Sequence, residues 1–174
     1  MTDPADPHSV ARTVLRLFVY GTLKRGYANH QGFCANARHI EEGATWGRLY
    51  HLPAGYPALE TAGELIIARG TGDPKADART QHTANGLKFS RPDGDWDLVR
   101  GELITFPDPA RDLPPIDGLE DFRPDGSGLY QRVLVPVRCG ATVLAAWTYV
   151  MPCPSNALRL AGGLWPAAAG KTPL

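Results

Sequence analysis

The chain has 174 residues, of which 43% are hydrophobic, enough to bury the core of one domain without help from disulfides or metals. Its 18 basic residues balance its 18 acidic ones. Nucleic acid and anionic membrane are therefore not expected partners, because both are bound through basic surfaces. The N-terminus lacks the basic and apolar regions of a signal peptide, and no apolar run approaches transmembrane length, so we expect a cytoplasmic protein.

The ends of the chain differ in composition from its middle. Residues 1–13 are polar and contain Pro4 and Pro7, which predicts a disordered lead-in. Residues 14–150 hold the strand-like runs and are expected to form one domain. Residues 151–174 are rich in Pro, Ala and Gly, and this tail either caps the domain or is partly disordered.

Short apolar runs predict strands in the first half of the chain. Residues 16–20 are apolar and stop at Gly21, which is typical of a strand buried on both faces. Residues 22–38 have few periodic apolar positions and are expected to form a loop with at most a short helix. Further strands are predicted at residues 43–52 and 65–68, with a turn at residues 55–59 between them.

The second half of the chain begins with a polar excursion, residues 69–96, with room for short strands near residues 87–89. Strand character returns at residues 97–106, and residues 130–138 and 142–150 are predicted to pair as a hairpin. Strands outnumber helices, and the consecutive late strands favour closure of the sheet. The sequence therefore predicts an α+β domain whose mixed or antiparallel sheet closes into a small β-barrel.

One helix is expected within residues 110–122, where Leu113, Ile116 and Leu119 recur at three-residue spacing. Pro114 and Pro115 interrupt this stretch. Because proline is tolerated in the first turn of a helix, the helix is predicted to begin near Pro115.

Two motifs are candidates for a functional site. A glycine turn follows the first predicted strand; there the backbone could approach a ligand and direct successive N–H groups at an anion, or the strand could simply end. The turn consists of Tyr20, Gly21, Thr22 and Leu23. The second candidate is Glu120, whose carboxyl is either a proton-transfer group in an apolar pocket or, like most acids, a solvated surface group.

Other chemistry finds little support in the sequence. The three cysteines, Cys34, Cys139 and Cys153, are widely spaced without a CxxC pair, so neither a zinc site nor a disulfide framework is predicted. The five histidines show no metal-binding spacing, and no phosphate loop or GxSxG elbow is present. Aromatic residues could line a pocket or pack in the core, among them Trp46, Tyr56, Tyr130, Trp147 and Tyr149.

Taken together, the sequence blocks resemble the γ-glutamylcyclotransferase-like (AIG2-like) family. The first block, residues 17–26, resembles that family's opening strand and its Tyr-Gly-Thr-Leu loop. The remaining blocks follow in family order, at residues 47–50, 55–59, 99–103, 116–120, 129–132 and 146–149.

The resemblance implies a small barrel with flanking short helices and a cavity between the turn and an acidic residue. It implies that Glu120 is the catalytic base, and that the backbone of Tyr20, Gly21, Thr22 and Leu23 holds the carboxylate end of the substrate. Tyr130 and Tyr149 match aromatic positions around that cavity. The implied reaction cyclises a small-molecule γ-glutamyl amide to 5-oxoproline with release of an amine, and needs no metal or organic cofactor.

The chain also departs from the family pattern, which often has glycine after the catalytic glutamate where this chain has Asp121. That second carboxylate either raises the pKa of the base or points to solvent. Two other functions stay open: a non-catalytic small-molecule or peptide-binding module on the same fold, and an interaction domain without a cavity. The sequence leaves the released amine and the oligomeric state undetermined.

Overall fold

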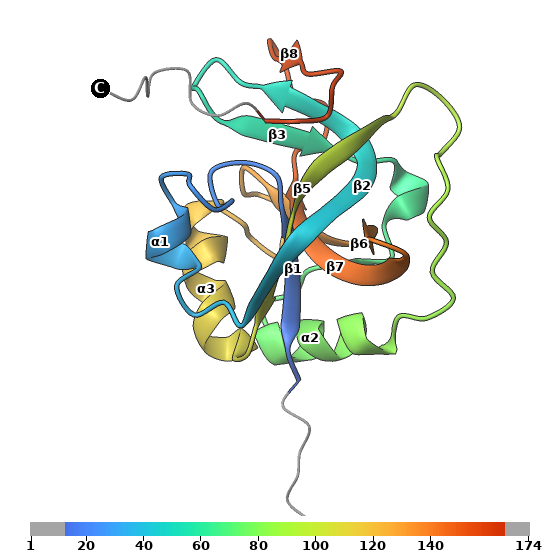
Figure 1. Ribbon diagram of the computed structural model, residues 1–174. Helices are drawn as coiled ribbons and strands as arrows, with labels where there is room; N and C mark the ends of the chain where they lie inside the picture. The colour runs from blue at the N-terminus through green and yellow to red at the C-terminus, as the bar shows by residue number, and fades with distance from the viewer. Residues whose placement is uncertain (1–12, 166–174) are drawn as a thin grey trace, which may run out of the picture.

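A computed structural model describes residues 13–165, and five strands of this region close into a barrel (Figure 1). The barrel closes where β2 pairs with β6, at Ala44 and Arg138. Neighbouring strands are antiparallel except for β1 and β7, which are parallel. In sheet order the strands are β2 (His39–His51), β5 (Asp97–Phe106), β1 (Leu15–Val19), β7 (Thr142–Val150) and β6 (Gln131–Cys139). The predicted fold class is confirmed.

β1 is buried on both faces because it lies between two hydrophobic clusters. Phe18 faces one cluster together with Leu103 of β5. Its neighbours Leu17 and Val19 face the other, which includes apolar residues of the helices. Alternation along a strand sends successive side chains to opposite faces, so a strand covered on both sides becomes a continuous apolar run.

β2 is long enough to belong to two sheets. Residues 39–47 pair with β5 in the barrel, whereas residues 48–51 pair with β3 (Pro57–Glu60) and residues 50–51 with β8 (Leu158–Arg159). A turn was predicted over residues 55–59, but it ends at residue 56 and the chain returns as β3. Figure 1 shows this small sheet above the barrel. The short strand β4 (Ala68–Arg69) pairs with β6 instead.

Helices flank the barrel: α1 (His30–Phe33), α2 (Pro74–Thr83) and α3 (Pro109–Leu119), with a 3₁₀ turn at Gly63–Leu65. α3 begins at Pro109, so the prediction that it begins near Pro115 is wrong. Asp108 caps it by accepting a hydrogen bond from the backbone N–H of Arg111. Pro114 and Pro115 lie inside the helix and lack the N–H groups that would have bonded to the carbonyls of residues 110 and 111. Both of those residues are exposed, so water can bond to their carbonyls instead.

The polar excursion contains α2, a ten-residue helix that the sequence analysis missed. Asp73 caps this helix and Pro74 occupies its first position. The short strands expected near residues 87–89 do not form; those residues cross the surface without regular structure. Of the predicted lead-in, residues 1–12 lie outside the described residues.

Candidate active site

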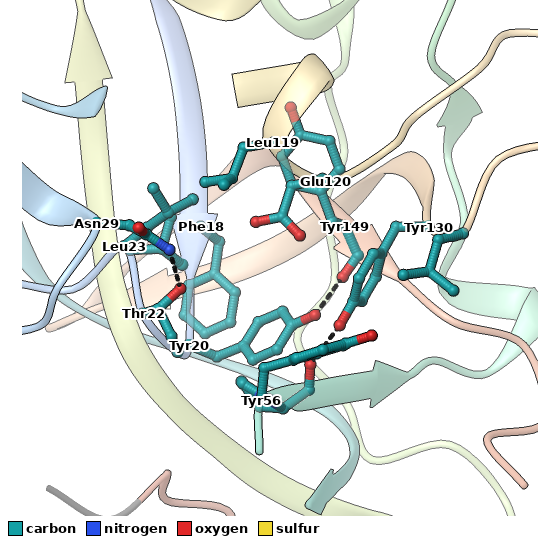
Figure 2. Close-up of a pocket in the computed structure, with 14 residues that line it drawn as sticks. Phe18, Tyr20, Thr22, Leu23, Asn29, Tyr56, Leu119, Glu120, Tyr130 and Tyr149 are labelled. Atoms are coloured by element: carbon teal, nitrogen blue, oxygen red, sulfur yellow. Dashed lines mark hydrogen bonds between the residues drawn. The ribbon is translucent and has the colours of Figure 1, made fainter. Parts of the chain in front are cut away.

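A cavity of about 390 Å³ lies between the turn that follows β1 and the end of α3. Its wall is mainly aromatic and aliphatic (Figure 2). The residues predicted from sequence all line it: Tyr20, Gly21, Thr22, Leu23, Glu120, Tyr130 and Tyr149. Tyr56, which the sequence analysis named as an aromatic residue that could line a pocket, also lines it. The sequence analysis did not assign the other lining residues, Phe18, Val19, Asn29, Pro57, Leu119 and Leu129.

Glu120 is placed by the way α3 ends. The backbone N–H of Asp121 bonds to the carbonyl of Gly118, and that of Phe122 bonds to the carbonyl of Asp117, at 3.3 and 2.9 Å. Asp121 between them has a φ of 47°, the left-handed conformation that closes a helix in this pattern. This is a position where glycine is usual, which explains the glycine that the family often has there.

The carboxylate of Glu120 points into the cavity, toward the hydroxyls of Tyr20 and Tyr130 (Figure 2). Burial raises the pKa of Glu120 from 4.5 to about 7. The side chain of Asp121 points away: one oxygen accepts a hydrogen bond from the N–H of Leu129 at 3.1 Å, and the other lies 3.3 Å from Arg123. Asp121 is exposed and does not contribute to the shift, so its carboxylate points to solvent.

The turn at residues 20–23 presents its backbone to the cavity. The N–H groups of Gly21, Thr22 and Leu23 donate no hydrogen bond to another residue within 13–165. Thr22 is held by Asn29, whose backbone N–H and side-chain amide donate to its carbonyl and hydroxyl at 3.1 and 3.0 Å. Unpaired N–H groups on a fixed turn are suited to bind an anion.

Gly21 is required by packing. A Cβ at this position would lie 2.3 Å from Cγ of Pro57, far inside contact distance. The turn and β3 therefore approach so closely that a side chain larger than hydrogen does not fit.

Three buried tyrosines form the floor of the cavity. Tyr20 donates its hydroxyl proton to the carbonyl of Tyr149 at 2.7 Å, and Tyr130 donates to the carbonyl of Pro57 at 2.6 Å. Burial raises the pKa of Tyr20 well above its usual value, and the nearby Tyr130 and Glu120 raise it further, against a small opposing effect from the N–H of Leu59. The phenols therefore keep their protons at neutral pH.

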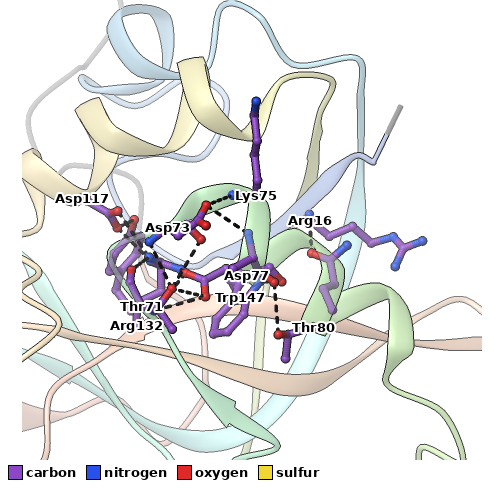
Figure 3. Close-up of polar contacts among 12 residues, drawn as sticks. Arg16, Thr71, Asp73, Lys75, Asp77, Thr80, Asp117, Arg132 and Trp147 are labelled. Carbon is purple, nitrogen blue, oxygen red and sulfur yellow. Dashed lines mark hydrogen bonds and ion pairs between the residues drawn. The ribbon is translucent and has the colours of Figure 1, made fainter. Parts of the chain in front are cut away.

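A buried ion network joins β6 to α2 and α3 (Figure 3). Arg132 of β6 is fully buried and pairs with Asp77 of α2 and Asp117 of α3, both at 2.8 Å. The hydroxyl of Tyr149 also donates to Asp117, at 2.7 Å. Asp117 is three residues before Glu120, so this network fixes the last turn of α3 against the barrel. The sequence analysis did not assign a role to Asp77, Asp117 or Arg132.

The described residues include no group of three or more His, Cys, Asp or Glu side chains placed to hold a metal ion. None of the helices between residues 13 and 165 has the length and apolar character to span a membrane.

Fold and site together define a small barrel protein with an acid-bearing, mainly apolar cavity. The chain belongs to the gamma-glutamyl cyclotransferase, AIG2-like family, whose model matches residues 17–71 and 76–167. No curated protein matches the chain.

Two solved structures are similar to this chain. YkqA from Bacillus subtilis aligns with a TM-score of 0.54 and 21% identity over 87% of this chain, which spans 39% of that protein. An AIG2-like protein from Mus musculus aligns with a TM-score of 0.39 and 23% identity, covering 79% of this chain and 77% of that one. At such identities, the similarity to YkqA supports the fold alone.

Proposed function

We propose that this chain is a γ-glutamylcyclotransferase that converts a γ-glutamyl amide into 5-oxoproline and a free amine. The observation that carries the proposal is the position of Glu120, a carboxyl with a pKa of about 7 that points into an apolar cavity. A general acid–base group works best when its pKa lies near the working pH. Membership of the family supports the same class of reaction.

In this mechanism the substrate's own α-amine is the nucleophile. Ionised Glu120 takes a proton from the α-ammonium, and the free amine attacks the γ-carbonyl carbon to close a five-membered ring. The tetrahedral intermediate then breaks the bond to the amide nitrogen as Glu120 returns the proton to that leaving nitrogen. The ring nitrogen gives up its second proton to the released amine, so the products are a neutral lactam and an ammonium ion. The bond formed and the bond broken are both carbon–nitrogen bonds, so the reaction needs no oxidant or reductant, and the proposed mechanism uses no metal or organic cofactor.

The turn after β1 would hold the other end of the substrate. The free N–H groups of Gly21, Thr22 and Leu23 can bind the α-carboxylate. Fixing that carboxylate and the α-ammonium together folds the flexible chain toward its cyclising conformer, which lowers the entropic part of the barrier. We also propose a cytoplasmic enzyme, because its cysteines are free thiols, as expected in a reducing compartment.

The test is to incubate the parent protein and its Glu120→Gln variant with a panel of γ-glutamyl amides and follow 5-oxoproline by mass spectrometry. We expect product from the parent and at least a 100-fold lower rate from the variant, since glutamine cannot accept the proton. Glu64→Gln, which changes an exposed acid of the 3₁₀ turn, is the matched control and should retain the parent rate.

Each outcome has a defined meaning. Product formation that survives Glu120→Gln would remove Glu120 from the mechanism. Binding of γ-glutamyl ligands without turnover would favour the non-catalytic binding module on the same fold. Absence of both over the whole panel would leave only the fold in common with the family.

A further inference from the structure

The hydrogen-bond directions on the cavity floor limit what the cavity can bind. A backbone carbonyl can only accept, so the bonds from Tyr20 to the carbonyl of Tyr149 and from Tyr130 to that of Pro57 use the single proton of each phenol. What each phenol oxygen still offers is a lone pair. Toward a ligand, these two hydroxyls therefore act as acceptors.

The two phenol oxygens lie next to the carboxylate of Glu120. Figure 2 shows the hydroxyls of Tyr20 and Tyr130 side by side, with the Glu120 carboxylate pointing toward them from above. Burial raises the pKa of both phenols, and the nearby charge of Glu120 raises it further, as expected for groups that share a small buried volume. A phenol oxygen has two lone pairs, so the nearby N–H of Leu59 leaves one on Tyr20 for a ligand.

We infer that Tyr20, Tyr130 and Glu120 form an acceptor-only subsite that binds the α-ammonium of the γ-glutamyl group. An ammonium carries three N–H donors and no acceptor, and the subsite offers two phenol oxygens and one carboxylate. The negative charge of the ionised Glu120 and the partial negative charge of the two phenol oxygens favour a cation, whereas a neutral or anionic group gains little there. This inference deepens the proposed function and rests on it for the identity of the ligand.

The subsite assigns distinct roles to its members. Glu120 contacts the proton that moves, whereas Tyr20 and Tyr130 are specificity-determining residues that fix the ammonium beside it. Once the ring closes, the nitrogen becomes an uncharged amide with a single N–H donor, so 5-oxoproline loses most of these contacts. The product is expected to bind at least 10-fold more weakly than a ligand with an intact ammonium.

The test uses two ligands that differ only in the α-ammonium and cannot cyclise: Nδ-phenyl-L-ornithine and 5-anilinopentanoic acid. Their affinities are measured by titration calorimetry at pH 7.5, where Glu120 is mostly ionised and the α-amine is protonated. We expect the parent protein to bind the ornithine derivative about 100-fold more tightly, since hydrogen bonds to a charged group contribute strongly.

Tyr20→Phe and Tyr130→Phe should each reduce the preference for the ornithine derivative about 10-fold, mainly by weakening the binding of that ligand. The ratio of the two affinities within one protein preparation does not depend on how much of a variant is folded. Tyr27→Phe is the matched control, because Tyr27 also donates its hydroxyl to a backbone carbonyl, that of Trp165, but does not line the cavity. It should leave the ratio unchanged.

The inference is overturned if the parent binds both ligands equally or neither, or if the two tyrosine variants leave the preference intact. The proposed reaction is tested separately, by 5-oxoproline formation from γ-L-glutamylanilide. Selective binding of the ammonium without that product would retain the subsite and reject the reaction.

Discussion

Gly21 shows how one missing side chain shapes the site. In Gly21→Ala, the new Cβ would lie 2.3 Å from Pro57, so the proline or the turn must shift. The carbonyl of Pro57 accepts the hydroxyl of Tyr130, and movement would disturb the cavity floor. We expect a loss of stability of about 1–3 kcal/mol, measured by urea unfolding, and at least a 10-fold fall in kcat/KM for 5-oxoproline formation.

Gly32→Ala in α1 is the matched control for this substitution. No heavy atom lies within 4 Å of a Cβ at Gly32, and its backbone is helical. Stability and activity should stay at the parent level or rise slightly. Equal behaviour of the two alanine variants would contradict the close approach of the turn and β3.

Glu120 should make stability and activity respond to pH in opposite directions. Its pKa is about 7 in the folded protein and 4.5 in an unfolded chain. The protonated form of Glu120 therefore favours folding. Its contribution to stability is fully present below about pH 4.5 and is lost as the pH rises through 7. Activity needs the ionised form, so kcat/KM should rise through the same interval.

The stability effect is measured against Glu120→Gln, which does not ionise. Partial exposure of the Glu120 side chain reduces the effect of its pKa shift on stability. We therefore expect the free energy of unfolding of the parent to fall by on the order of 2 kcal/mol relative to that of the variant between pH 4.5 and 8. Urea unfolding at the two pH values gives the difference. A constant difference would mean that the carboxyl is not desolvated.

For single residues of the cavity, the sequence predicted those that belong to a continuous motif and not those that come together only in the fold. The turn and Glu120 were predicted because family blocks contain them, and the cavity brings them together. Asn29 lies in a connecting segment with no periodicity. Tyr56 and Leu129 lie inside family blocks, but the blocks do not show which way a side chain points. Only the folded chain shows that they face the same space.

Among the elements, α2 was missed because its buried face is polar. Asp77 and Gln81 lie one helical turn apart and are buried beside Ala78. Asp77 pairs with Arg132, and the side chain of Gln81 accepts a hydrogen bond from the backbone N–H of Arg16. A search for apolar periodicity cannot find such a face. The capping pair Asp73 and Pro74 was the available signal for the helix.

The ion network that α2 completes should be costly to break. Arg132→Met keeps the length of the side chain but leaves the buried Asp77 and the half-buried Asp117 without their counter-ion. We expect a loss of about 3–5 kcal/mol in the free energy of unfolding, and partial recovery when Asp77→Asn is added. Chemical denaturation of the two single variants and the double variant measures both.

Arg159→Met is the surface control for the network. Arg159 pairs with Asp95 and Asp97, but its side chain is 30% exposed and water can replace the contacts. Its loss should cost less than about 1 kcal/mol. If Arg132→Met costs no more than this, the buried network does not hold α3 in place.

For the whole molecule, the sequence predicted the hairpin of β6 and β7 and the closure of the sheet into a barrel. It did not show which strands pair to close it. Closure depends on the contact between Ala44 and Arg138 and on the parallel pairing of β1 with β7. These contacts join distant parts of the chain, and no local pattern specifies them.

The segment after β7 contributes to this architecture through Trp165. Its ring stacks on His51, with centroids 5.0 Å apart, and its carbonyl accepts hydrogen bonds from Lys24 and Tyr27 beyond the turn. Trp165→Ala should lower stability by about 3 kcal/mol and reduce Tm in a calorimetric scan. Leu164→Ala, which changes a 54% exposed neighbour, should leave Tm almost unchanged. Similar shifts for both variants would contradict this role.

The pairing of β1 has a consequence for the order in which the protein is made. Phe18 pairs with Leu103 and Leu17 with Trp147, so β1 leaves the ribosome long before either partner strand. The turn that lines the cavity continues directly from β1 and cannot be fixed until both edges of that strand are paired. A strand synthesised late therefore completes a site whose first residues were synthesised at the start, and a nascent chain that has not reached β7 lacks a completed cavity in which to bind a ligand.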